Sequence, residues 1–254
     1  MRILSALLAL AFVSVLPKSL AASPECEKAV HLEVDYVVCR VSGADGDIRM
    51  FLNNAAGAPF GHFRHVDDAL RENGERLAFA MNAGMYAPDR APAGLYVEAG
   101  ATLKAANTNE GPGNFHLKPN GVFWVAEDDD GVRRAHVTTT EKYLAADEKK
   151  VRYATQSGPM LVIDGVMHPR FLEDATSKKR RNGVGVTDAG EVIFVLADAP
   201  VTFHDFAAFF RDDLKTPDAL FLDGSISRVY APSLARHDRG AALGPIVGVV
   251  VSNE

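Results

Sequence analysis

The chain has 254 residues, and its 33 acidic and 27 basic side chains give a net charge of −6 at neutral pH. Charges of both signs are mixed along the sequence, which argues against a protein that binds nucleic acid through a concentrated basic surface. Residues 178–181 form a local basic run, which we interpret as a solvated loop or an anion site. The length suits one large domain or two entangled subdomains, and we assign residues 23–254 to a single domain.

The N-terminus has the pattern of a secretory signal peptide. A positive Arg2 precedes the apolar residues 3–15, and small residues at 19–22 offer a cleavage site. The apolar stretch is shorter than the ~20 residues that a membrane-spanning helix needs. We therefore predict that residues 1–22 are removed, with an uncleaved anchor as the alternative. The mature protein is then periplasmic or secreted, without stable membrane insertion.

Cys26 and Cys39 are the two cysteines of the chain, and both lie near the predicted mature N-terminus. Disulfides form readily in oxidising, extracytoplasmic compartments. We predict that these residues are joined in a disulfide that ties the N-terminal segment to the first strand.

Short apolar segments separated by dense turn signals indicate a chain made mostly of strands. Residues 32–36 alternate apolar and polar side chains, as a half-buried strand does. Asp-Gly within residues 163–166 is typical of a type I′ hairpin. Residues 187–190 and 127–131 are further predicted turns between strands. We expect an α+β fold with a mixed, largely antiparallel sheet core and a few packed helices.

Two helices are predicted, at residues 65–73 and 203–214, from apolar side chains at helical spacing. Each is followed by an apolar strand, at residues 77–81 and 219–222 respectively. If these two strands lie side by side, their ends meet in one crevice, where open α/β sheets bind ligands.

Asn82 and Asp223 follow those two strands directly. A carboxylate at a buried strand end costs free energy unless it is paired or used in chemistry. We interpret Asp223 as a nucleophile or general base. The alternative is that it caps the turn at Gly224 by accepting hydrogen bonds from backbone amides.

A series of short motifs follows along the chain: Asn82–Tyr86, Gly113–Phe115, Ser157–Leu161, Arg181–Val186, Phe203–Ala207 and Leu222–Ser225. Their order and spacing, over about residues 77–251, resemble the phosphodiester glycosidase family, closest to its compact bacterial exported branch. The resemblance implies an α+β fold and hydrolysis of a sugar-1-phosphodiester. Many family members have Asp-Gly-Gly-Gly-Ser at the last motif. Here Ser225 and Ile226 replace two of those glycines, which suggests a different substrate.

Hydrolysis of a glycosyl–phosphate bond releases a phosphate monoester, whose second pKa is ~6, so it leaves without a strong proton donor. The site must hold that anion while positive charge develops on the sugar. The order of the family motifs along the chain favours Arg181 as the catalytic cation, with its guanidinium group pointing into the entrance of the site. For a second carboxylate, Glu110 on a glycine-rich loop and Asp198 at the end of a strand are rivals.

Neutral donors and glycines complete the predicted site. Asn82 and Asn114 suit phosphate oxygens or sugar hydroxyls, and Ser157 is a binder because it lacks the elbow motif of a nucleophilic serine. The predicted substrate-binding residues are Asn82, Gly84, Asn114, Gln156, Ser157, Gly158, Asp198, Gly224 and Ser225. No cofactor is predicted with certainty. A divalent metal at Asp223 stays open, although no loop has the ligand ladder of an EF-hand.

The leading interpretation is an exported hydrolase that acts on a small molecule or glycan carrying a phosphodiester-linked sugar. One alternative is a metal-dependent phosphodiesterase that uses Asp223 and Asp198. The other is a periplasmic module that binds saccharides without catalysis.

Overall fold

A computed structural model describes residues 21–146 and 150–253. Residues 1–20, most of the predicted signal peptide, lie outside the described residues. Three sheets, with few helices, make up the molecule, and every strand pair within them is antiparallel. The predicted α+β fold is confirmed. None of the described helices is both long and apolar enough to cross a bilayer.

The first sheet carries the strand that ends at Asp223. In spatial order its strands are β1 (Glu25–His31), β2 (Val34–Ser42), β13 (Glu191–Ala197), β12 (Asn182–Val186), β14 (Asp218–Asp223), β10 (Met160–Ile163) and β11 (Val166–Met167).

The other two sheets have five strands each. The second, which carries Asn82, runs β16 (Arg236–His237), β15 (Val229–Ala231), β4 (Glu75–Asn82), β17 (Ile246–Ser252) and β3 (Asp47–Phe51). The third runs β6 (Ala101–Lys104), β5 (Tyr96–Glu98), β9 (Lys150–Ser157), β7 (Gly121–Glu127) and β8 (Arg133–Thr139).

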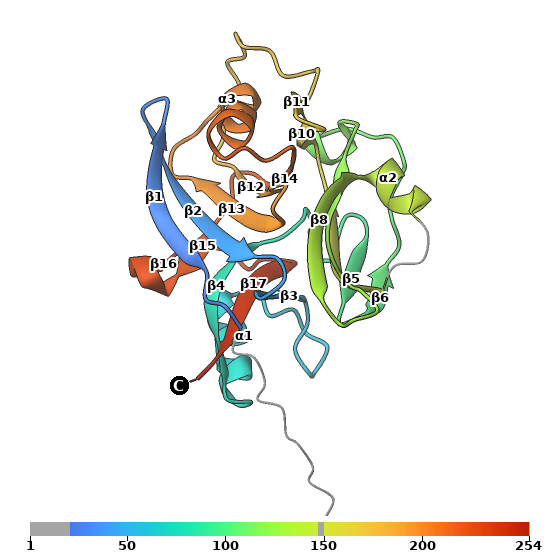
Figure 1. Ribbon diagram of the computed structural model, residues 1–254, viewed down its shortest axis with the longest axis vertical. Helices are drawn as coiled ribbons and strands as arrows, with labels where there is room; N and C mark the ends of the chain where they lie inside the picture. Colours follow the sequence, from blue (N-terminus) through green and yellow to red (C-terminus); the bar gives the residue numbers. More distant parts are fainter. Residues whose placement is uncertain (1–20, 147–149, 254) are drawn as a thin grey trace, which may run out of the picture.

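Each sheet is covered by a helix (Figure 1). The helices are α1 (Phe63–Arg71) against β4, α2 (Thr140–Ala145) against β7 and β8, and α3 (Phe203–Ala208), which continues as the π-helical turn η2 (Phe209–Asp213). Thr202 begins α3 by accepting a hydrogen bond from the Asp205 amide at 3.0 Å. The 3-10 turns are η1 (Asn114–His116) and η3 (Pro232–Leu234). Both predicted helices are therefore present, and the second ends in a π turn.

The three sheets meet in one apolar core around Phe194 of β13. Its ring centroid lies 5.0 Å from that of Phe79 on β4 and 5.7 Å from that of Phe123 on β7. All three side chains are fully buried. One aromatic cluster thus joins a strand from each sheet and fixes how the strand ends are placed relative to one another.

The turn chemistry was largely predicted correctly. The Asp164–Gly165 turn joins β10 to β11 with positive φ at both residues, and turns at 187–190 and 127–131 separate strands as expected. The strand predicted at residues 32–36 is confirmed from Val34 onward, where β2 begins, and is wrong for the first two residues. Leu32 and Glu33 have φ of 47° and 61° and form the turn between β1 and β2, because the alternation of side chains continues on both sides of it.

Cys26 and Cys39 form the predicted disulfide. They face each other in the register of β1 and β2, with their Cα atoms 4.0 Å apart. The bridge therefore ties the outermost strand of the first sheet to its neighbour.

Replacing Phe194 by Ala should destabilise the protein by about 3–5 kcal/mol, because the cavity opens where all three sheets meet. Leu172, which is 63% exposed, provides the control, and Leu172→Ala should change the free energy of unfolding by less than about 0.5 kcal/mol. Urea denaturation measures both. Equal stabilities for the two variants would contradict a shared core.

Candidate functional site

Asn82 and Asp223 lie close together, although not in the way the sequence suggested. Their strands, β4 and β14, belong to different sheets, so the expectation that these strands pair side by side is wrong. The two strand ends meet across the boundary between the sheets instead. Asn182, at the start of β12, connects them.

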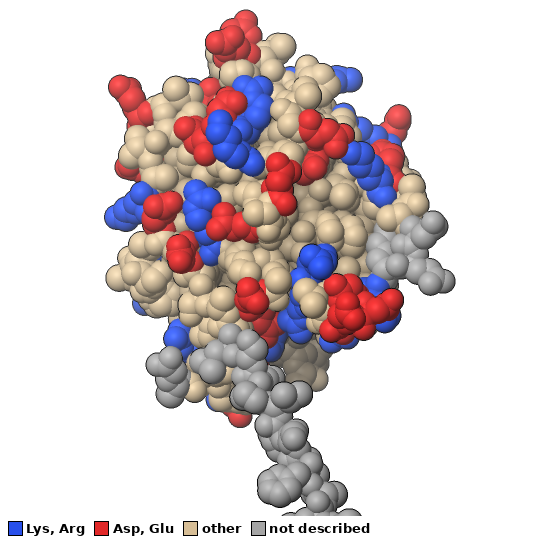
Figure 2. Space-filling model, viewed as in Figure 1, with Lys and Arg blue, Asp and Glu red and all other residues tan. Residues whose placement is uncertain are grey.

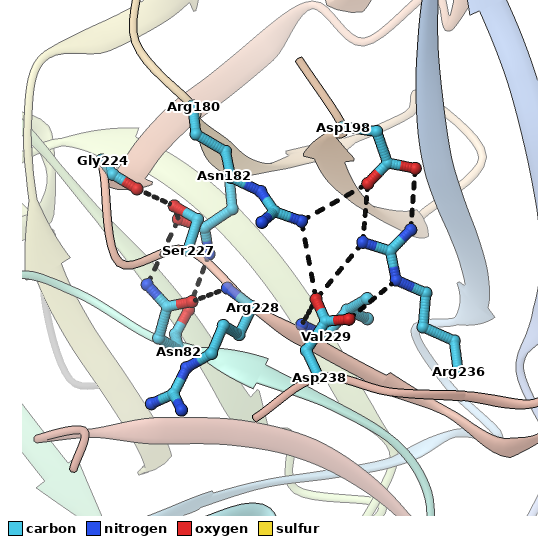
Figure 3. Close-up of polar contacts among 10 residues, drawn as sticks. All are labelled: Asn82, Arg180, Asn182, Asp198, Gly224, Ser227, Arg228, Val229, Arg236 and Asp238. Atoms are coloured by element: carbon cyan, nitrogen blue, oxygen red, sulfur yellow. Dashed lines mark hydrogen bonds and ion pairs between the residues drawn. The ribbon is translucent and has the colours of Figure 1, made fainter. Parts of the chain in front are cut away.

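The side chain of Asn182 is fully buried and bonds to three chain segments (Figure 3). Its Nδ2 donates to the carbonyl oxygen of Asn82 at 2.8 Å. Its Oδ1 accepts from the Asp223 amide at 2.8 Å and from the Ser227 hydroxyl at 3.1 Å. A single amide side chain therefore holds β4, the end of β14 and the segment after it in one arrangement.

Asp223 is partly exposed, and neutral donors surround its carboxyl group. The Gly224 amide donates to Oδ1 at 2.6 Å, and the Asn82 side chain also hydrogen-bonds to the carboxyl group. Burial raises the pKa of Asp223 to about 6, against the smaller lowering effect of these two donors. The group is therefore mostly ionised at pH 7, as a nucleophile must be, and can accept a proton near neutral pH, as a general base must.

Tyr86 is a neighbour of this carboxylate. Burial, and then the negative charge of Asp223, raises the pKa of the phenol, which stays protonated at neutral pH. Its hydroxyl is 3.5 Å from the carbonyl oxygen of Ala242. The phenol thus donates its hydroxyl proton to the loop that precedes β17.

Arg181 does not open into a site entrance as expected. Its side chain is 2% exposed, and the guanidinium lies 3.5 Å from the ring centroid of Phe203. Nε donates to the Val201 carbonyl at 3.0 Å and Nη2 to that of Ser177 at 3.3 Å. Burial lowers its pKa to about 10. Because strand residues alternate between faces, Asn182 turns to the site while Arg181 packs on the α3 side.

Asp198 belongs to an ion-pair network beside the site (Figure 3). Arg236 binds both of its oxygens, Oδ2 at 2.7 Å and Oδ1 at 2.6 Å, and Arg180 lies 3.4 Å from Oδ1. Both arginines also contact Asp238. The bidentate pair occupies the carboxylate, so Asp198 serves here as a structural anion rather than a free second carboxylate.

The side chains of Gln156 and Ser157, at the end of β9, hydrogen-bond to segments around the site. The Gln156 amide is buried and bonds to the Leu95 amide, to both backbone groups of Asn107 and to the Thr140 hydroxyl, at 2.8–3.1 Å. The Ser157 hydroxyl donates to the Leu222 carbonyl at 2.7 Å and lies 3.4 Å from the Met85 amide. Their polar atoms bond to neighbouring segments of the chain, and their predicted contact with substrate stays a prediction.

The predicted glycines divide into two kinds. A Cβ atom on Gly84 would collide with the Gln156 carbonyl, and one on Gly158 would lie 2.7 Å from Asn120 Cβ. Those glycines are required by packing between segments. A Cβ atom on Gly224 would meet nothing closer than 3.8 Å, and Ser225 beside it is exposed. Packing therefore does not require a glycine at position 224.

Asn114 and Glu110 are both exposed. The carbonyl of Asn114 is 3.3 Å from the position that a Cβ on Gly158 would take, which places η1 beside the end of β9. Glu110 forms no ion pair with any described residue. Within residues 21–146 and 150–253, no group of three or more His, Cys, Asp or Glu side chains is arranged to hold a metal ion.

Three contributors were missed as site residues: the Asn182 amide, the Ser227 hydroxyl and the Arg228 backbone. The Arg228 amide donates to Asn82 Oδ1 at 3.0 Å, so the segment after β14 completes the frame around Asn82. A polar Asn at the start of an otherwise apolar strand was the available signal for Asn182. No pattern in the sequence shows which segment such a side chain binds.

Comparison with known proteins identifies the family of the chain. Residues 75–246, which contain β4, β12, β14 and the loops between them, match the model of the phosphodiester glycosidase family. The chain belongs to this family of phosphodiester glycosidases, and the resemblance seen in its motifs is confirmed.

Among its relatives is YigE of Escherichia coli K12, an uncharacterized protein that is 37% identical over 183 residues, 72% of this chain and 69% of that one. The catalytic domain of zebrafish N-acetylglucosamine-1-phosphodiester alpha-N-acetylglucosaminidase, auto-inhibited by its pro-peptide, superposes with a TM-score of 0.58 at 14% identity, over 93% of this chain and 84% of that one.

Two bacterial structures are also similar. A hypothetical protein from Synechocystis has a TM-score of 0.56 at 14% identity, over 90% of this chain and 62% of that one. A candidate exported protein from Burkholderia pseudomallei K96243 has a TM-score of 0.57 at 11% identity, over 85% and 74% of the two chains. At these identities the structural likeness establishes the fold.

Asn182→Ala should destabilise the protein by about 2–4 kcal/mol, because the buried Asn82 carbonyl and Asp223 amide both lose their partner. The matched control is Asn73→Ala, which removes one exposed bond to the Ala69 carbonyl and should cost less than about 0.5 kcal/mol. Chemical denaturation compares the two. An Asn182→Ala protein as stable as the control would show that this amide does not hold the site together.

Proposed function

We propose that this chain is an exported hydrolase that cleaves a sugar from a sugar-1-phosphodiester, with Asp223 as the nucleophile or general base. Membership of the phosphodiester glycosidase family supports the reaction class. The observation that carries the assignment to Asp223 is its carboxyl group, which stands at a strand end with a pKa raised by burial to about 6. Carboxylates with such shifts cluster at functional sites.

The groups around Asp223 suit a substrate whose leaving group is already an anion. Gly224 donates through its amide, Tyr86 carries a protonated phenol, and Ser225, two residues after Asp223, is exposed. Because a phosphate monoester leaves without a strong acid, a single carboxylate with neutral donors meets the main chemical need. We assign Glu110 no catalytic role in this proposal.

We also propose that residues 23–254 act as one domain and that the protein works in the periplasm or is secreted. The shared aromatic core of three sheets supports the single domain. Two features support export: the Cys26–Cys39 disulfide, and an N-terminal sequence in which a basic residue precedes an apolar stretch.

Asp223→Asn should lower kcat/KM by at least about a hundredfold towards a sugar-1-phosphodiester, because the neutral amide can neither attack nor accept a proton. Purified protein is incubated with a panel of such substrates, and products are read by mass. For the wild type, kcat/KM should fall as pH decreases through about 6, where Asp223 takes up a proton. Undiminished turnover by Asp223→Asn would reject the assignment.

The same variant must be folded for this result to count. The pKa of Asp223 is higher in the folded protein than the ordinary value of 3.8, so the ionised carboxylate destabilises the fold above about pH 6. Asp223→Asn should therefore melt at or above the wild-type temperature at pH 8, and this advantage should disappear below about pH 4.

Hydrolysis in ¹⁸O-labelled water shows which bond of the substrate is cleaved. Cleavage of the P–O bond, in place of the C–O bond, would instead indicate a phosphodiesterase.

A further inference from the structure

A cavity of about 630 Å³ lies next to the candidate site, between α1 and the β15–β16 hairpin. It is lined by an unusual number of basic side chains: Arg64, Arg228, Arg239, His62, His65 and His237. This concentration contrasts with the mixture of acidic and basic side chains over the face of the molecule in Figure 2. The proposed reaction at Asp223 does not use this cavity.

The acidic side chains of the cavity are already paired. Asp67 accepts from Arg71 Nε and from the Leu77 amide, each at 2.8 Å. Asp238 is bound by Arg236 and accepts from the Val229 amide at 3.2 Å. Their charges are therefore largely neutralised by groups outside the set of basic lining residues.

Arg228 has no carboxylate partner within ion-pair distance in the described part of the chain. Arg228 is 7% exposed, and its Nη2 donates to the carbonyl oxygen of Ala241. Burial lowers its pKa, which shows the cost of holding this charge away from water. A buried cation beside a cavity, with a single neutral acceptor, is the arrangement that a bound anion would stabilise.

The other two arginines of the cavity, Arg64 and Arg239, are exposed. Arg239 makes no ion pair with a described residue, and Arg64 has only a 4.0 Å contact with Asp68 on the same helix. The N-terminus of the nine-residue helix α1 adds a positive dipole end to the same wall, since His62 provides no side-chain cap and the first turn has no acidic residue.

We propose that this cavity binds the phosphate group of a small phosphorylated organic molecule. Several arginines around one pocket match the several oxygens and the double charge of a phosphate monoester. The volume lies within the range of small-molecule sites and exceeds the needs of a bare anion. Phe63, Tyr230 and Leu243 provide the less polar wall for the organic part. The inference stands independently of the proposed hydrolysis.

Isothermal titration calorimetry tests it with glucose 6-phosphate and inorganic phosphate as probes. The wild type should bind glucose 6-phosphate at least about threefold more tightly than inorganic phosphate. Arg64→Ala/Arg239→Ala should weaken binding of glucose 6-phosphate at least about tenfold, because two of the three arginines that line the cavity are lost. Both residues are exposed, so the double variant should melt like the wild type.

Arg170→Ala/Lys104→Ala is the matched control. It removes the same charge from exposed positions outside the cavity and should bind within about twofold of the wild type. Equal weakening by both double variants, binding of inorganic phosphate alone, or no binding of either probe would overturn the proposal. The titrations are repeated with Asp223→Asn, so the result holds whether or not the protein hydrolyses a phosphodiester.

Discussion

The buried amide of Asn182 is the interaction on which the candidate site depends. It stands where the first and second sheets meet, and it bonds to the ends of β4 and β14 at once. A side chain with both a donor and an acceptor is needed here, since one strand end offers a carbonyl and the other an amide. Without it, two polar backbone groups would be buried without partners, at about 1–3 kcal/mol each. The same amide therefore positions the residues of the site and stabilises the boundary between the two sheets.

Arg181 and the partly exposed Asp223 both lie near this frame, and their surroundings differ. The guanidinium of Arg181 contacts two carbonyl oxygens and an aromatic ring, while its Nη1 is buried without a hydrogen-bond partner among the described residues. Asp223 receives only neutral donors, so its charge is poorly compensated and its pKa rises. The first arrangement secures a segment of β12 against α3. The second raises the pKa of a carboxyl group to about 6, which suits the proposed hydrolysis.

Local sequence signals predicted the elements well, because turn and helix chemistry acts over a few residues. Asp164–Gly165 and the helix after Thr202 are examples. The family was also predictable, since its motifs lie in order along the chain. Asp223 was singled out as a candidate from its predicted place at a strand end, and it is the last residue of β14.

The partners of individual side chains were less predictable, because they come from segments far apart in sequence. Gln156 and Ser157 have the chemistry of ligand donors, but neighbouring backbone groups use their polar atoms. Arg181 differs from Asn182 only by one step along a strand, and that step turns it to the opposite face. Register and sheet assignment decide such cases, and neither is visible in a single sequence.

The central claim is that neutral surroundings, not a cation, hold the carboxyl group of Asp223 in a poorly solvated position. The most direct measurement is a ¹³C NMR titration of its side-chain carboxyl carbon, assigned by comparison with Asp223→Asn. The account predicts a midpoint near pH 6. A midpoint near 3.8, the ordinary value for this group, would show a solvated or ion-paired carboxylate and would contradict the account.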